Sequence, residues 1–166
     1  DEEPERSPEL RHVRAGDTEI VVARYAGYCY GVERALRLTG EALEGAPPPV
    51  ATLGPIIHNP NVVGALKDRG VDVVEEVDDA AAGTLIIRTH GISPDVLQHA
   101  RSRHLNVVDA TCPFASVAQR EAAMLREAGY AVVILGERDH PEVVGLEGFA
   151  GSDAVAVAYV ETQRPD

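Results

Sequence analysis

Several ordinary components are scarce in this 166-residue chain, and each shortage excludes a class of protein. No apolar run approaches the roughly 20 residues of a membrane-spanning helix, so we expect no membrane partner. Two cysteines cannot form the disulfide framework of a small secreted domain, and no basic segment followed by an apolar one marks a secretion signal. We therefore expect a cytoplasmic protein with reduced thiols. Only 15 Lys and Arg stand against 27 Asp and Glu, and the net charge of −12 argues against a nucleic-acid partner.

A regular alternation of strand and helix patterns is present instead. Short β-branched runs predict strands at 20–23, 50–53, 71–74, 85–87, 106–108, 130–135 and 154–160. Periodicity and capping residues predict helices at 32–44, 60–69, 94–103 and 114–128, with a short acidic helix ending at Gly83 and a helical turn after His140. This alternation is typical of right-handed βαβ units, so we expect an α/β fold of small parallel sheets with helices on both faces. Residues 1–18 have no apolar period and predict an acidic leader whose composition is compatible with disorder.

Five loops that join a predicted strand to the next helix carry a cysteine or a histidine. Such loops gather at the carboxyl edge of a parallel sheet, where ligands bind and helix N-termini point. One histidine in such a loop is more often a capping or packing residue, but five loops together predict a functional site. Its candidate residues are Cys29, His58, His90, Cys112, and His140 with Glu142.

Both cysteines lie in settings that suit a bound group. Gly27 and Gly31 flank Cys29 and allow backbone amides to approach a ligand closely. Cys112 precedes Pro113 and a predicted helix, whose N-terminus favours a thiolate, and proline after a ligand cysteine recurs in iron–sulfur proteins. A disulfide or two buried thiols are the alternatives to a metal site. The Cys and His spacings match no zinc signature, although these residues could form a zinc site, and the sequence has neither a dinucleotide-binding Gly motif nor a P-loop.

Five segments, in order along the chain, resemble the 4-hydroxy-3-methylbut-2-enyl diphosphate reductases, the LytB/IspH family of iron–sulfur enzymes. The resemblance covers roughly residues 19–151. The segments are GYCYGVERA at 27–35, GPIIHN at 54–59, THGI at 89–92, DATCP at 109–113 and HPEV at 140–143.

The resemblance implies a function and a set of residue roles. It implies an oxidoreductase that removes the hydroxyl of 4-hydroxy-3-methylbut-2-enyl diphosphate to give isopentenyl and dimethylallyl diphosphate, the last step of non-mevalonate isoprenoid precursor biosynthesis. Three cysteines would hold a [4Fe–4S] cluster with one open iron site, two of them at Cys29 and Cys112 and the third outside this sequence. The diphosphate would be held by His58, His90 and His140, and Glu142 would deliver protons. Reduced ferredoxin or flavodoxin would supply the electrons.

The resemblance also implies a domain organisation. The family has three small α/β domains and is about twice as long as this chain. Residues 19–29 with 113–166 would form the first domain and residues 30–112 the second, while the third would be absent.

Two other interpretations stay open at this point. The chain could be a catalytically incompetent two-domain homologue that binds a diphosphate or a metal. It could also be a zinc hydrolase that uses the same cysteines and histidines.

Overall fold

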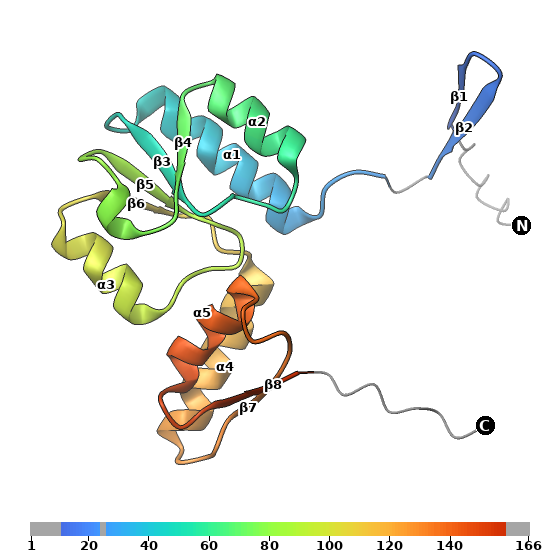
Figure 1. Ribbon diagram of the computed structural model, residues 1–166. Coiled ribbons are helices and arrows are strands. Elements are labelled where there is room, and N and C mark those ends of the chain that lie inside the picture. The colour runs from blue at the N-terminus through green and yellow to red at the C-terminus, as the bar shows by residue number, and fades with distance from the viewer. Residues whose placement is uncertain (1–10, 24–25, 159–166) are drawn as a thin grey trace, which may run out of the picture.

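A four-stranded parallel sheet forms the larger part of the computed structural model, which describes residues 11–23 and 26–158 (Figure 1). The strand order is β4-β3-β5-β6, and every neighbouring pair is parallel. The strands are β3 (Val50–Leu53), β4 (Val71–Val74), β5 (Thr84–Ile87) and β6 (Asn106–Asp109). The predicted parallel α/β fold is confirmed.

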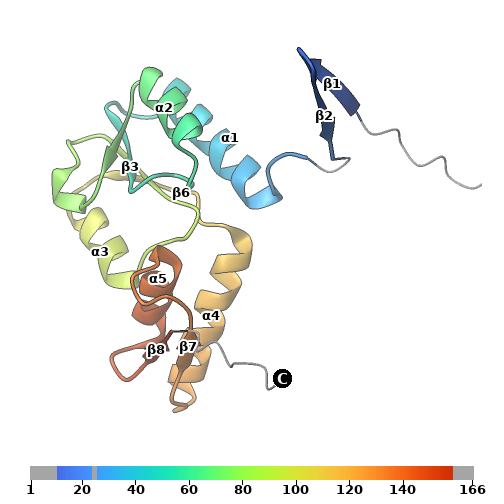
Figure 2. The same cartoon turned by 45° about the vertical axis from the view of Figure 1, so that its right-hand side comes forward.

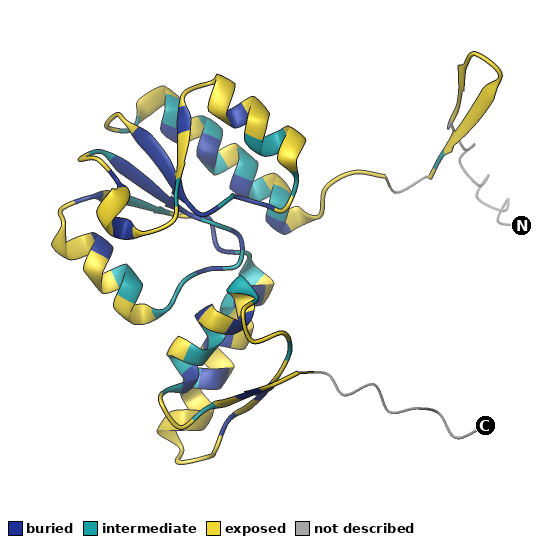
Figure 3. Ribbon diagram, viewed as in Figure 1, coloured by how far each residue is buried: buried dark blue, intermediate teal, exposed yellow. Residues whose placement is uncertain are grey.

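Helices cover both faces of this sheet (Figures 1 and 3). On one face, α1 (Tyr30–Gly45) and α2 (Pro60–Asp68) enclose a core that includes Val50 and Ile86. On the other face, α3 (Pro94–Ser102) and the single 3-10 turn η1 (Val77–Asp79) enclose a core that includes Ala51 and Leu85. Neighbouring residues of one strand therefore pack into different cores, as the period of two requires. Burial on both faces explains the continuous apolar runs of β3 and β5, whose residues are all buried.

Local capping residues set the start of several helices. The side chain of Asn59 accepts hydrogen bonds from the backbone N–H groups of Asn61 and Val62, and Pro60 follows at the first helical position of α2. Ser93 caps α3 in the same way by accepting a hydrogen bond from Val96 N. Side-chain caps satisfy N–H groups that have no partner within the helix.

A smaller unit follows the sheet. It contains α4 (Pro113–Glu127), β7 (Val133–Leu135), α5 (Pro141–Ala150) and β8 (Val155–Val157), with β7 parallel to β8. Ile134 and Ala156 pack with the helices in one core. The opposite face of this two-stranded sheet is open: Val133 and Leu135 are 61% and 75% exposed. Helices on both faces are therefore found for the four-stranded sheet and not for β7–β8 within the described residues.

The first strand prediction is wrong in its pairing. β2 (Thr18–Val22) pairs antiparallel with β1 (Arg11–Ala15), and in both Figure 1 and Figure 2 this hairpin lies apart from the parallel sheets. The leader prediction is accordingly wrong for residues 11–18, which form strand and turn, whereas 1–10 lie outside the described residues. Local β propensity identified a strand but could not identify its partner. The grouping of residues 19–29 with 113–166 in one domain stays a prediction.

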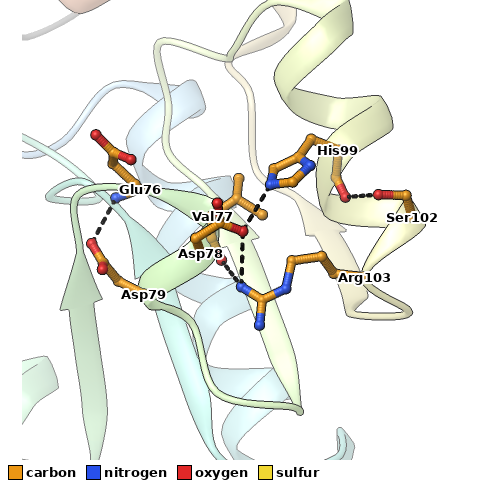
Figure 4. Close-up of polar contacts among 7 residues, drawn as sticks. All are labelled: Glu76, Val77, Asp78, Asp79, His99, Ser102 and Arg103. Atoms are coloured by element: carbon orange, nitrogen blue, oxygen red, sulfur yellow. Dashed lines mark hydrogen bonds and ion pairs between the residues drawn. The ribbon is translucent and has the colours of Figure 1, made fainter.

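Three further elements are shorter than predicted. The strand predicted at 154–160 is β8 (Val155–Val157), and 159–160 lie outside the described residues. The strand predicted at 130–135 begins only at Val133, and the acidic helix predicted before Gly83 is only η1. η1 is held to α3 by a polar network (Figure 4): Arg103 donates to Val77 O over 2.7 Å, and His99 Nε2 lies 2.9 Å from Asp78 Oδ1. These contacts hold the single turn of η1 against α3, although no longer helix forms there. No helix among the described residues is both long and apolar enough to cross a membrane.

Candidate functional site

The loops at the carboxyl ends of three sheet strands carry predicted site residues. His58 follows β3, His90 follows β5, and Cys112 follows β6 and lies at the N-cap of α4. The other two positions also begin helices: Cys29 lies at the N-cap of α1 and His140 at the N-cap of α5. Parallel strand order therefore brings the loops of His58, His90 and Cys112 to one end of the sheet. Cys29 and His140 reach the same region by packing, since Cys29 borders a cavity with Cys112 and the His140 ring lies beside those of His58 and His90.

Three of these loops place their histidines together, and we call His58, His90 and His140 the imidazole triad. Their ring centroids are 4.8 Å (His58–His90), 5.3 Å (His90–His140) and 5.9 Å (His58–His140) apart. One ring nitrogen from each residue lies within 4.8 Å of the others. His58 is exposed and the other two are half-buried, so the triad is open to a ligand from solvent.

The two cysteines border one cavity of about 290 Å³, which we call the thiol cavity. His90 and Glu142 line the same cavity, so His90 belongs to both the triad and the thiol cavity. Gly31 is required here, because a Cβ at this position would lie 2.6 Å from Cys112 Sγ. Both cysteines are free, which removes the disulfide interpretation.

Backbone hydrogen bonds connect the loops that hold these side chains. Ile56 O, in the His58 loop, accepts from Thr89 N over 3.3 Å and from Thr89 Oγ1 over 3.0 Å. Thr89 O in turn accepts from Cys112 N over 2.8 Å. Buried Gln119 of α4 donates from Nε2 to His90 O over 3.2 Å. The loops thus form one connected framework beneath the triad and the thiol cavity.

His140 also accepts a backbone hydrogen bond, which selects the tautomer of its neutral ring. Its Nδ1 accepts a hydrogen bond from the backbone N–H of Glu142 over 3.2 Å. A neutral ring that accepts at Nδ1 carries its proton on Nε2, which makes Nε2 a hydrogen-bond donor. A donor suits an anionic oxygen and not a metal ion, which needs a free lone pair. In this tautomer His140 is therefore better arranged for an anion than for zinc.

Glu142 lies at the start of α5 and borders two cavities. It lines the thiol cavity with both cysteines, and it lines a cavity of about 360 Å³ with His140 and the end of β7. Its side chain is exposed and receives no hydrogen bond from the described residues. A carboxyl in this position can exchange protons with solvent on one side and with a group in the thiol cavity on the other.

Burial sets the charge of His90. The pKa of His90 is lowered from 6.5 to about 4, first because burial disfavours the charged ring and then because the cationic forms of the neighbouring His58, Arg88 and His140 would repel it. Its buried Nδ1 has no hydrogen-bond partner in the described chain. A bound anion would supply the charge compensation that His90 lacks.

This leads to a prediction for the titration of His90. In the free chain its ring is expected to titrate near pH 4, and with inorganic diphosphate bound its pKa is expected to rise by one unit or more because the anion favours the charged form. The folded pKa lies below the unfolded value, so the contribution of this group to stability is full above about pH 6.5 and is lost as the pH falls toward 4. Histidine ring NMR, with the His90 signal assigned from its absence in His90→Gln, measures both pKa values. A free-chain midpoint near 6.5 would contradict the effect of burial.

Sequence reasoning missed the residues that support the site. Arg34, Thr89 and Gln119 all make hydrogen bonds to loop backbone near the candidate ligands. Arg34 and Thr89 lie within the segments that resemble the reductase family, and this position in the sequence could have marked them as site residues. Nothing in the local pattern distinguished Gln119 from other polar residues of α4.

Two thiols, three imidazoles and a carboxylate near the loop end of a parallel sheet define the class: an α/β protein with a candidate ligand-binding site. Comparison with known proteins gives the family. The model of the LytB protein family matches residues 20–165, and the chain belongs to this family. The resemblance carried by five sequence segments is thereby confirmed.

Similar proteins of known name agree with the family assignment. The 4-hydroxy-3-methylbut-2-enyl diphosphate reductase of Pelobacter propionicus is 41% identical over 145 residues, which are 87% of this chain and 51% of the relative. That of Syntrophotalea carbinolica is 45% identical over 148 residues, or 88% of this chain and 53% of the relative. The chain therefore spans about half the length of the curated relatives that it matches.

Solved structures show the same partial match. A structure of (E)-4-hydroxy-3-methyl-but-2-enyl diphosphate reductase, the terminal enzyme of the non-mevalonate pathway, is 40% identical with a TM-score of 0.74, covering 86% of this chain and 52% of that one. The reductase from Plasmodium falciparum is 31% identical with a TM-score of 0.77, covering 81% of this chain and 42% of that one. The fold is shared with these enzymes over most of the chain.

Proposed function

We propose that this chain is the part of a 4-hydroxy-3-methylbut-2-enyl diphosphate reductase that binds the substrate diphosphate and supplies two cysteine ligands of a [4Fe–4S] cluster. The observation that carries the proposal is the position of His90, which borders the imidazole triad on one side and the thiol cavity on the other. A diphosphate on the triad would therefore bring the rest of its molecule beside the thiols.

The residues of the thiol cavity partly fit an iron–sulfur cluster. Cys29 and Cys112 are free thiols at helix N-termini on one cavity, and Gly31 leaves room for the Cys112 sulfur. The sequence has only these two cysteines, so a third thiolate would come from outside it. With one iron open, the bound cluster would act as a Lewis acid on the substrate oxygen and would pass electrons to the substrate.

The remaining steps can be assigned to the residues of this chain. His140 would donate from Nε2 to a diphosphate oxygen, while His58 and a protonated His90 would add charge-assisted hydrogen bonds. Glu142 would deliver a proton to the departing hydroxyl. The balanced reaction takes up two electrons and two protons: the C–O bond breaks, one proton leaves in water, and the other forms a C–H bond in isopentenyl or dimethylallyl diphosphate. Reduced ferredoxin or flavodoxin would be the source of the electrons.

Diphosphate binding tests the proposal directly. In calorimetric titrations with 4-hydroxy-3-methylbut-2-enyl diphosphate, His58→Ala, His90→Ala and His140→Ala are each expected to weaken binding about tenfold or more, because each removes a hydrogen bond to a charged group. His99→Ala is the matched control, since His99 is exposed, contacts Asp78 and lies outside the site.

Two results would point elsewhere. Tight zinc binding that depends on the triad, with no affinity for the diphosphate, would favour the hydrolase interpretation. Diphosphate binding without reductase activity, after completion with the remaining half of a relative and cluster assembly, would favour a catalytically incompetent homologue.

A further inference from the structure

Arg34 lies in α1, the helix that begins after Cys29, and has no role in the function proposed above. It is half-buried and follows Cys29, the N-cap of the helix, by little more than one turn. Among the described residues it makes no ion pair, unlike Arg37 of the same helix, whose Nη1 lies 2.6 Å from Glu41. The Arg34 guanidinium instead donates hydrogen bonds to backbone carbonyl groups.

Both ends of the Arg34 guanidinium reach the loop that carries Cys112. Nη1 donates to Thr111 O over 3.1 Å, and Nη2 donates to Asp109 O over 3.3 Å. These carbonyl groups lie one and three residues before Cys112. A planar guanidinium can span two acceptors at once with a fixed orientation, which a lysine ammonium cannot reproduce in full.

The loop that receives these hydrogen bonds is also held by hydrogen bonds of its own. The Asp109 carboxylate accepts from the backbone N–H of Thr111 over 2.9 Å, and Cys112 N donates to Thr89 O over 2.8 Å. Arg34 therefore connects two hydrogen-bonded elements: the helix that begins after Cys29 and the loop that ends at Cys112. At Gly31, between Cys29 and Arg34 in the sequence, an added Cβ would lie 2.6 Å from Cys112 Sγ, so the start of the helix approaches the Cys112 side chain closely.

We propose that Arg34 is a positioning residue that fixes the spacing of the Cys29 and Cys112 thiols, so that both can bind one metal centre. The inference depends on the proposed function only in taking these thiols as ligands of a common centre. Without Arg34, each thiol keeps its own helix N-terminus, but the helix and the loop can shift relative to each other. Residues that orient metal ligands typically change metal affinity by about 10- to 100-fold when they are replaced.

Cadmium ions test this inference on the chain without any cluster. Thiolate-to-cadmium charge transfer in the ultraviolet reports how many thiolates bind each ion. We expect the unmodified chain to bind one Cd²⁺ through both thiolates. Arg34→Met is expected to lose about half of the charge-transfer intensity per bound ion and about 10- to 100-fold in affinity. Arg34→Lys should recover part of both, and Arg37→Met, on the same helix, should change neither.

The outcomes separate positioning from general destabilisation. All titrations are made at a temperature well below the thermal unfolding midpoint of each variant. If Arg34→Met does not fold, Arg34→Gln takes its place. Wild-type intensity and affinity in the folded Arg34 variant would overturn the positioning role alone. Failure of the unmodified chain to bind Cd²⁺ through both thiolates would instead contradict the proposed cluster ligands.

Discussion

Replacing Glu142 by Gln is expected to lower the reductase kcat by about 10²- to 10⁴-fold in a full-length protein completed with the remaining half of a relative. Gln has nearly the same shape but cannot deliver a proton, and general acid catalysis typically contributes a factor of this size. The substitution leaves both cysteines and the triad in place, so cluster absorbance and substrate affinity should stay close to those of the unmodified protein. Steady-state kinetics with a low-potential reductant, together with the visible spectrum, measure both effects.

Glu147→Gln provides a matched control for this experiment. Glu147 lies on the same helix, α5, but lines neither the thiol cavity nor the cavity beside His140. Its replacement should leave kcat unchanged. Normal turnover by the Glu142→Gln enzyme would show that another group is the proton donor.

Replacing Cys112 by Ser is expected to abolish iron and sulfide binding by this chain. Two thiolates hold a four-iron cluster less well than three, so the unmodified chain, reconstituted anaerobically, should bind iron and sulfide weakly and lose them quickly in air. Removing one of the two thiolates should lower the residual uptake by at least about tenfold. Iron and sulfide analysis after desalting, with the visible spectrum, measures the uptake.

The stability of the apo chain is the control for Cys112→Ser. Serine is close to cysteine in size, and Cys112 is only partly buried, so the free energy of unfolding should change by less than about 1 kcal/mol. Cys29→Ser should behave in the same way if both thiols bind one centre. A stoichiometric, air-stable cluster in the unmodified chain would contradict the expectation that the third ligand lies outside these residues.

Most of the fold could be predicted because its determinants are local. The buried strands β3 and β5 are short apolar runs, and α2 and α3 begin at Asn59-Pro60 and Ser93-Pro94, where capping chemistry is contained within four residues. β2 shows where local information fails. Its residues have strand propensity, but propensity does not select a partner, and β2 pairs with a segment for which no strand was predicted.

The sequence by itself determined which side chains are available. For His58, His90 and Cys112 it also determined the edge of the sheet at which they lie, because the loops after the strands of one parallel sheet gather at its carboxyl edge. Cys29 follows β2 of the antiparallel hairpin and His140 follows β7 of a separate sheet, so tertiary packing placed their loops beside the others. Only the tertiary structure decided how these loops are held. The hydrogen bonds of Arg34, Thr89 and Gln119 join residues 77, 33 and 29 positions apart, and no local pattern specifies such contacts. The tautomer of His140 and the lowered pKa of His90 have the same origin, since both depend on the atoms that packing places around each ring.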